Sequence, residues 1–220
     1  MSRFATYALV ILFTGSVFAQ KTPSRKNAAG NQRKQNPAMA EVTDVEGLPR
    51  VLLIGDSISI GYTVPVREML EGKANVHRPR ANCGPTTQGV KQIEKWLGDE
   101  KWDLIHFNFG LHDLKYMGPK GKNLADPTSK DSFQQVPPEK YAANLKKLVA
   151  RLKKTDAKLI WRNTTPVPKG AAGRIVGHSR KYNEIAKAIM EENEIPIDDH
   201  YTLAMKQPKL QIQALSLIHI

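Results

Sequence analysis

Short apolar runs alternate with amphipathic stretches from residue 50 onwards. The run 51–54 (VLLI) is continuously apolar and rich in branched side chains, as is typical of a strand buried on both faces of a parallel sheet. Further runs with strand character follow it at 74–77, 103–109, 158–162 and 194–197. The pattern therefore predicts five strands, of which the first is central.

Helical periodicity lies between these runs. One helix is predicted over 61–71, and a second is expected to begin at a Thr86 or Thr87 cap. Pro138 opens a long third helix. The second, third and fourth helices each carry apolar residues at helical spacing: Val90, Ile93 and Leu97; Tyr141, Leu145, Leu148 and Leu152; Tyr182, Ile185 and Ile189. Strands separated by helices indicate an α/β fold, a parallel sheet with helices on both faces.

The N-terminus has the layout of a secretory signal peptide. Arg3 precedes the apolar run 7–13, and the run 16–19 (SVFA) ends in the small residue Ala19, as at a signal-peptide cleavage site. We expect cleavage after Ala19 and a secreted or periplasmic protein without a stable membrane anchor; a retained anchor is the competing interpretation. Residues 20–48 are polar and basic, and we expect a disordered linker there before a domain at 49–213.

The chain of 220 residues has a formal charge of +12, which invites a nucleic-acid interpretation. Much of this charge falls on the helix that Pro138 opens, at Lys140, Lys146, Lys147, Arg151, Lys153 and Lys154. A solvated helix face explains it, and attraction to acidic polymers is the alternative. Because no nucleic-acid-binding signature accompanies the charge, we expect no nucleic-acid partner.

The candidate chemistry begins at the end of the first strand, in Gly55-Asp56-Ser57-Ile58-Ser59. A serine between a buried strand and a helix start presents its hydroxyl at the open edge of the sheet. Its N–H lies near a helix N-terminus, where negative charge is stabilised. Alone the signal is weak, because Gly-Asp-Ser is also an ordinary turn and N-cap sequence.

Two further loops reach the same edge of the predicted sheet. The second strand is followed by Asn82-Cys83-Gly84-Pro85, and the third ends in the run 108–113 (NFGLHD). Ligands of open α/β sheets bind beyond the carboxyl ends of the strands. Three polar or glycine-bearing loops therefore converge on one crevice.

These motifs resemble the SGNH (GDSL-like) hydrolase family: a GDS box, a glycine turn, a Gly-x-x-Asp box and the run 163–168 (NTTPVP). The resemblance implies a three-layer α/β/α sandwich with a five-stranded parallel sheet in flavodoxin-like order. It also implies hydrolysis of acyl esters with Ser57 as the nucleophile. The oxyanion hole would then comprise the N–H groups of Ser57 and Gly84 and a side chain of the third box, with supporting roles for Asp56, Gly110 and Asp113.

The third box departs from the family pattern. The family usually has Gly-x-Asn-Asp, and here His112 stands in the place of the asparagine. An imidazole N–H donates one hydrogen bond as an amide does, so His112 is our candidate for the oxyanion hole. A purely structural role for His112 is the alternative.

The family's general base, a histidine in an Asp-x-x-His box near the C-terminus, has no match after residue 190. Asp198-Asp199-His200 has the wrong spacing, and the ending 214–220 breaks the amphipathic pattern. We expect a reading frame truncated near residue 213, with a non-native tail at 214–220 and an incomplete C-terminal part of the fold. An intact gene would continue into Asp-x-x-His, and the chain as it stands would turn over little.

Other chemistry finds little support. Six scattered histidines and the single cysteine form no ligand cluster, so no metal and no cofactor are expected. Cys83 is interpreted as a packing residue, and the loop from Tyr116 to Gln135 as a passive surface excursion; the alternative is a loop that overhangs the site. The sequence thus predicts a secreted serine esterase acting on a small-molecule or carbohydrate acyl ester. A non-catalytic carbohydrate- or polyanion-binding module is the alternative.

Overall fold

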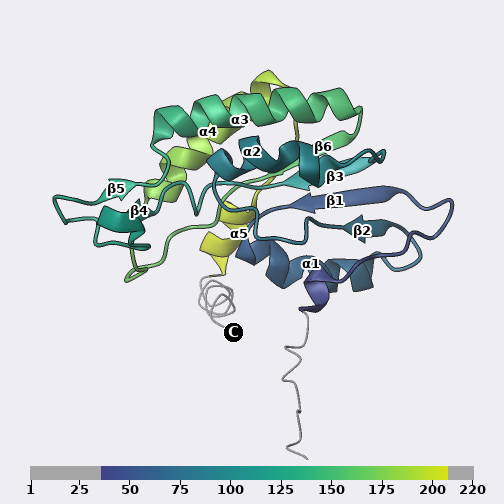
Figure 1. Cartoon of the computed structure of the whole chain (residues 1–220), viewed down its shortest axis with the longest axis horizontal. Coiled ribbons are helices and arrows are strands. Elements are labelled where there is room, and N and C mark those ends of the chain that lie inside the picture. Colours follow the sequence, from purple (N-terminus) through teal and green to yellow (C-terminus); the bar gives the residue numbers. More distant parts are fainter. Residues whose placement is uncertain (1–35, 208–220) are drawn as a thin grey trace, which may run out of the picture. The chain divides into compact units, whose positions relative to one another are not determined.

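A computed structural model describes residues 36–207. Within them a five-stranded sheet runs in the order β2-β1-β3-β6-β7, with every pair parallel (Figure 1). Its strands are β1 (Arg50–Ile54), β2 (Asn75–His77), β3 (Leu104–Phe107), β6 (Lys158–Arg162) and β7 (Ile197–Asp198). The predicted parallel sheet of flavodoxin-like order is confirmed. The predicted signal peptide at 1–19 and tail at 214–220 lie outside the described residues.

Helices cover both faces of this sheet, as Figure 1 shows. One face carries α2 (Thr86–Leu97), α3 (Pro138–Leu152) and α4 (His178–Glu192), and the other carries α1 (Ser57–Met69) and α5 (His200–Lys206). A hairpin of β4 (Tyr116–Met117) and β5 (Phe133–Gln134) and three short 3-10 turns complete the described part: Pro37–Met39, Pro119–Gly121 and Lys153–Thr155. The three-layer α/β/α architecture is confirmed.

Alternation along β1 explains why both faces need a helical layer. Leu52 and Ile54 join the large core under α2, α3 and α4, whereas Val51 and Leu53 pack with Val76 against α1. Successive side chains of a strand point to opposite faces, so a strand that is apolar at every position has to be central. The run 51–54 therefore placed Ser57 after an interior strand, between β2 and β3.

Several element bounds differ from the sequence-based expectation. Helix α1 begins at Ser57 rather than at residue 61, because the Asp56 carboxylate caps it by accepting the Ile58 N–H at 3.0 Å. The expected threonine cap of α2 is wrong: Pro85 is the N-cap, and no side chain caps the helix. The fifth strand begins at Ile197, and α5 was not predicted.

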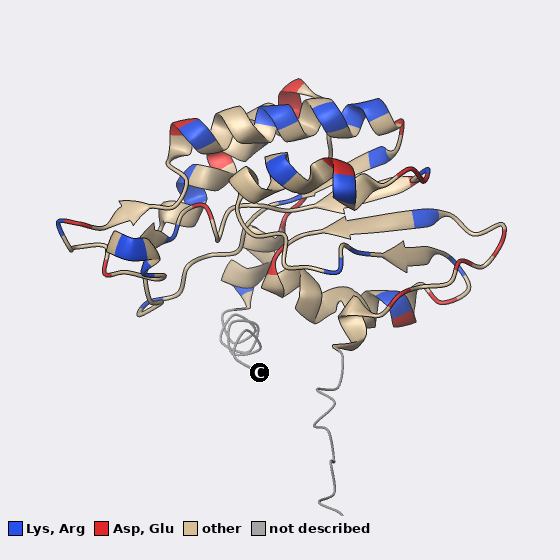
Figure 2. Ribbon diagram, viewed as in Figure 1, with Lys and Arg blue, Asp and Glu red and all other residues tan. Residues whose placement is uncertain are grey.

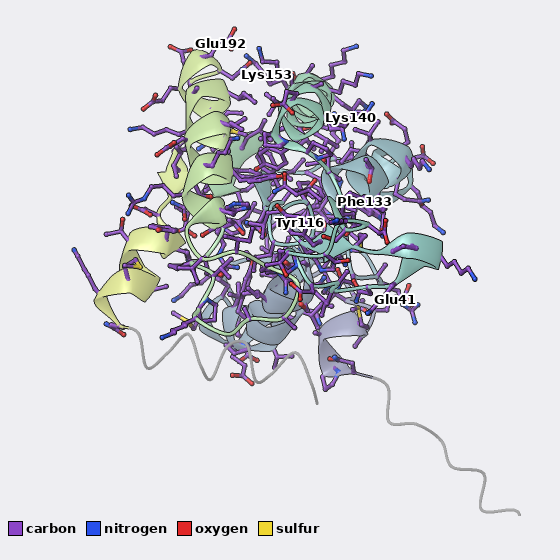
Figure 3. All side chains as sticks on the ribbon, turned by 90° about the vertical axis from the view of Figure 1, so that its left-hand side faces the viewer. Glu41, Tyr116, Phe133, Lys140, Lys153 and Glu192 are labelled. Carbon is purple, nitrogen blue, oxygen red and sulfur yellow. The ribbon has the colours of Figure 1, made fainter. Side chains whose placement is uncertain are left out.

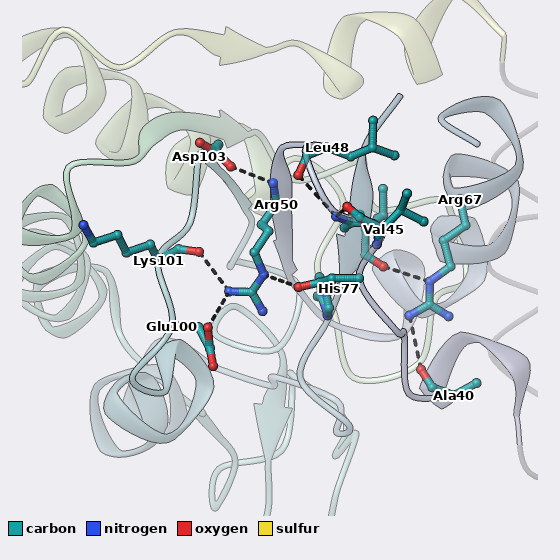
Figure 4. Close-up of polar contacts among 12 residues, drawn as sticks. Ala40, Val45, Leu48, Arg50, Arg67, His77, Glu100, Lys101 and Asp103 are labelled. Carbon is teal, nitrogen blue, oxygen red and sulfur yellow. Dashed lines mark hydrogen bonds and ion pairs between the residues drawn. The ribbon is translucent and has the colours of Figure 1, made fainter. Parts of the chain in front are cut away.

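Residues 36–48, which the sequence analysis placed in a disordered linker, pack against the domain (Figure 4). We call this segment the N-terminal strap. The buried Asn75 side chain accepts the Val45 N–H at 2.9 Å and donates to the carbonyls of Val45 and Leu48. Arg67 donates to the carbonyls of Pro37 and Ala40. Polar composition predicted disorder, but side chains of the domain pair with the backbone of the strap and hold it.

The basic residues of α3 lie on its solvent side, in keeping with a solvated face (Figure 2). All of them are exposed except Arg151, which is half-buried and forms a two-pronged ion pair with Glu94 at 2.7 Å. Among residues 36–207, no helix has the length and apolar character needed to cross a membrane.

Candidate active site

Ser57 is the first residue of α1, separated from the interior strand β1 by Gly55 and Asp56. Its side chain is half-buried, and neither its hydroxyl nor its N–H forms a hydrogen bond with residues 36–207. The first N–H groups of a helix have no partner inside the helix. Ser57 therefore offers an unpaired hydroxyl together with an unpaired backbone donor at the positive end of the helix dipole.

A buried arginine holds the turn that carries Ser57. Two of the Arg78 nitrogens donate to the Ser59 and Thr63 hydroxyls, at 3.2 and 2.9 Å, and to the Gly55 carbonyl at 3.3 Å. Gly55 has no room for a side chain, because an added Cβ would lie 2.6 Å from Cβ of Ser59. These contacts fix the β1–α1 turn, so the Ser57 backbone is positioned before any ligand binds.

Cys83 takes part in the same packing. Its N–H donates to the Gly55 carbonyl at 3.2 Å, and its side chain is fully buried. Burial raises the pKa of the thiol to about 11, so Cys83 remains protonated at neutral pH. The structure gives this residue the features of a packing group.

Ser57 opens into a cavity of about 570 Å³ at the carboxyl edge of the sheet. Asp56 and His112 share this cavity with Ser57, so three of the predicted site residues come together there. The remaining lining comes from loops: Asn82, Leu111, Lys115, Asn123, Leu124, Pro168, Lys169, Gly170, Ala171, Ala172 and Arg174. The volume is in the range of small-molecule sites.

His112 is half-buried in the wall of this cavity. Burial lowers its pKa; the Asp56 carboxylate opposes that shift, and the charges of Lys115 and Arg174 add to it. His112 is therefore neutral at pH 7 and carries one N–H donor and one acceptor nitrogen. It forms no hydrogen bond with another described residue, so its donor is available to a ligand.

Asp113 lies behind the cavity and is fully buried. Its Oδ1 accepts both the N–H and the hydroxyl of Thr86, at 2.9 and 2.5 Å, while Oδ2 has no partner among the described residues. Asn144 donates to the same threonine hydroxyl at 3.1 Å. This network ties the loop after β3 to the start of α2 and to the middle of α3.

The two glycines predicted at the site have different surroundings. Gly84, at φ +60°, is buried, and its N–H donates to Oδ1 of Asn82 at 3.0 Å instead of facing the cavity unpaired. Gly110, at φ +152°, lies against Thr164, where a Cβ would approach to 3.0 Å. The structure thus places Gly110 in a supporting contact and brings Asn82, rather than Gly84, into the cavity lining.

The loop from Tyr116 to Gln135 overhangs the cavity, which corrects the interpretation as a passive excursion. Asn123 and Leu124 line the cavity, and the Tyr116 N–H donates to the Gly173 carbonyl at 2.7 Å. Tyr116 and Phe133 of the hairpin are labelled in Figure 3. The hairpin and the loop 168–174 together form the outer wall of the site.

Three cationic residues of the cavity, Lys115, Lys169 and Arg174, were not predicted from the sequence. Lys115 comes two residues after Asp113, so its place beside the third box was a usable signal. Arg174 had no signal: a surface-type residue in a turn-rich segment reaches the cavity only because Gly173 packs against Leu124. Its Nε donates to the Leu111 carbonyl at 3.1 Å.

The acid–histidine group near the end of the described part lies apart from the cavity lining. Asp198 pairs with His200 at 2.9 Å and with His106 at 3.1 Å, and both histidines lower its pKa. His106 also meets the Tyr62 ring of α1 edge-on, so this group belongs to the face covered by α1 and α5. None of its members forms a hydrogen bond or ion pair with Ser57.

The GDSL-like lipase/acylhydrolase family model matches residues 53–219 of the chain. No curated protein sequence matches it. Similar solved structures include a lipase/acylhydrolase from Enterococcus faecalis, with a TM-score of 0.57, 17% identity, and coverage of 73% of this chain and 80% of that one.

Two further structures are similar at the level of the fold. AlinE4, described as an SGNH-hydrolase family esterase, has a TM-score of 0.54 at 15% identity, with 76% of this chain and 84% of that one covered. The acetyl xylan esterase AlAXEase has a TM-score of 0.53 at 13% identity, with 68% and 76% covered.

Proposed function

Since the chain belongs to the GDSL-like lipase/acylhydrolase family, we propose that it hydrolyses acyl esters through an acyl-enzyme on Ser57. The observation that supports this most directly is the unpaired Ser57 hydroxyl at the start of α1, facing a cavity of about 570 Å³. Secretion after cleavage of residues 1–19 is part of the same proposal.

In the first step the Ser57 oxygen attacks the ester carbonyl, and the alcohol leaves with the serine proton. In the second step water adds to the acyl-enzyme, and a carboxylic acid departs as the Ser57 hydroxyl re-forms. The Ser57 N–H and the His112 N–H are our proposed donors to the oxyanion, with Gly84 as a third donor if Asn82 turns away. Asp56, Gly110 and Asp113 hold the three loops in place.

The substrate is proposed to be a small-molecule or carbohydrate acyl ester, such as an acetyl ester. The similarity to an acetyl xylan esterase supports this choice at the level of the fold. The cavity supports it as well, because its volume of about 570 Å³ lies in the range of sites that bind small molecules.

We expect the chain to release p-nitrophenol from p-nitrophenyl acetate and to carry one acetyl group on the peptide that contains Ser57. Turnover should be slow, because no described residue lies at hydrogen-bond distance from the Ser57 hydroxyl, and general-base catalysis contributes about 10²–10⁴-fold. Ser57→Ala should abolish both signals, as measured by absorbance and by peptide mass spectrometry. The exposed Ser129 gives the matched control, and Ser129→Ala should behave as the wild type.

A binding module on a hydrolase scaffold is the second candidate. It is favoured by one observation: the Gly84 N–H, an expected oxyanion donor, is already engaged by Asn82. Equal p-nitrophenol release by the wild type and Ser57→Ala, with no acetylated Ser57 peptide, would exclude the hydrolase and leave the binding module.

A further inference from the structure

Positive charge predominates in the cavity that Ser57 faces. Lys115, Lys169 and Arg174 line it, and Asp56 is the one carboxylate among its lining residues. The Asp56 carboxylate is already engaged, since it accepts the Ile58 N–H at the start of α1. The lining therefore carries more cationic than anionic groups, although attack of Ser57 on an ester carbonyl requires no negative charge on the substrate.

Lys115 is the least expected of these cations. It is only 7% exposed, and its ammonium forms no hydrogen bond or ion pair with residues 36–207. Buried lysines are rare unless paired, because removing an ammonium from water is costly. The stem of Lys115 is buried, whereas its Nζ is still reached by solvent through the cavity that the residue lines. An unpaired ammonium held in this way is the arrangement expected of a site that receives an anion.

No neighbouring carboxylate fully neutralises the positive charge of Lys115. Asp113 is the acid whose charge raises the pKa of Lys115, but burial raises the pKa of that acid to about 7, so it is only partly ionised at neutral pH. Lys115 and Arg174 line the same cavity, and burial together with the Arg174 charge lowers the pKa of Lys115. A ligand anion between Lys115 and Arg174 would offset both the burial of the ammonium and the repulsion between the two cations.

Arg174 supplies a second group directed at the same space. Its Nε is held by the Leu111 carbonyl at 3.1 Å, and its terminal nitrogens have no partner among the described residues. An arginine anchored through Nε presents its remaining N–H groups in a fixed direction, the geometry with which guanidinium groups bind carboxylates.

We propose that this cavity selects esters that carry a carboxylate close to the scissile ester bond, with Lys115 and Arg174 as the residues that bind the carboxylate. This inference rests on the proposed hydrolase function for its substrate class, but the anion site itself can be tested without turnover. The carboxylate can belong to the acyl part or to the alcohol part of the ester, and separate probes distinguish the two.

The test measures binding of amide analogues, which are not consumed, to the full chain by isothermal titration calorimetry. Succinic acid mono-p-nitroanilide carries the carboxylate on the acyl side, and its methyl ester is the neutral match. p-Acetamidobenzoate carries it on the alcohol side, again with its methyl ester as the neutral match. In at least one pair the anion should bind about tenfold more tightly, the range of a charge-assisted hydrogen bond.

Lys115→Met keeps the length and apolar stem of the side chain and removes the charge. We expect the ratio between anionic and neutral probe to fall close to one in this variant. Lys146, exposed on α3, supplies the matched control, and Lys146→Met should keep the tenfold ratio. Thermal unfolding of each variant verifies that the fold is intact.

The outcomes separate the two proposals. Equal binding of both members of each pair by the wild type would overturn the anion site, as would a tenfold ratio that survives in folded Lys115→Met. A preserved anion preference together with failure of Ser57-dependent ester hydrolysis would support the anion site and contradict the hydrolase.

Discussion

At the scale of single residues, Asp113 of the Gly-x-x-Asp box shows how burial changes the pKa of a carboxyl group. It is fully buried with one oxygen unpaired, so the folded chain favours its protonated form. The pKa of Asp113 is raised from 3.8 to about 7. Between these values the folded state binds more protons than the unfolded state, and stability therefore falls as the pH rises through this window.

Replacing Asp113 by Asn should remove this pH dependence. We expect the free energy of unfolding of the wild type to fall by about 4 kcal/mol relative to Asp113→Asn between pH 4 and pH 8. Urea denaturation at a series of pH values measures it. Asp131, an exposed acid with no hydrogen bond or ion pair in the described part, gives the control: Asp131→Asn should follow the wild-type profile. Parallel curves for the wild type and Asp113→Asn would show that Asp113 is ionised in the fold.

At the scale of elements, the outer wall of the cavity depends on one close contact between loops. Gly173 has φ +61°, and a Cβ there would lie 2.4 Å from Cα of Leu124 in the hairpin loop. Only glycine permits this approach, because the neighbouring atoms are backbone and cannot move aside cheaply. The contact holds Leu124 over the Ser57 cavity and brings Arg174 to it.

Gly173→Ala should therefore separate the two loops, whereas Gly170→Ala should not. Gly170 has φ +83°, with nothing within 4 Å of an added Cβ, so that variant carries the backbone strain without the clash. We expect Gly173→Ala to cost about 1–3 kcal/mol more than Gly170→Ala in urea denaturation. Hydrogen exchange at the Tyr116 N–H, which donates to the Gly173 carbonyl, should speed up only in Gly173→Ala. Equal exchange in both variants would mean that the loops tolerate the side chain.

At the scale of the described part as a whole, the N-terminal strap extends the domain to residue 36. Asn75 makes the same kind of contact with the strap that a neighbouring strand would make, by pairing with backbone groups at Val45 and Leu48. Arg50 adds an ion pair to Asp44 at 2.6 Å and stacks over Trp102. The strap thus covers the β2 edge of the sheet near the amino ends of the strands.

Asn75→Ala should release the strap. Three hydrogen bonds are lost and buried backbone groups remain unpaired, so we expect a destabilisation of about 2–3 kcal/mol and faster proteolytic cleavage within 36–48. Limited proteolysis with mass spectrometry measures it. Asn193→Ala, which removes a bond to the Ile189 carbonyl and one from Lys153 at the end of α4, should leave cleavage of the strap unchanged. Unchanged cleavage in Asn75→Ala would show that Arg67 and Arg50 suffice to hold the strap.

The sequence by itself determined the order along the chain of the five sheet strands and of the helices α1 to α4, and the place of Ser57. These features follow from local periodicity: a continuously apolar run has to be a central strand, and the residues after parallel strands meet at one edge. The motifs then identified the loops around Ser57 and His112, because each loop lies directly after its strand.

Only the tertiary structure decided what those loops contact. Thr86 pairs with Asp113, Arg174 reaches the cavity through the contact of Gly173 with Leu124, and the strap pairs with Asn75, all between residues 27 or more positions apart. Such contacts depend on how layers pack, which no periodicity encodes. The place of Ser57 could thus be predicted from its strand, and its role as nucleophile from the resemblance of the motifs, whereas the positive charge of its cavity emerges only when distant loops close around it.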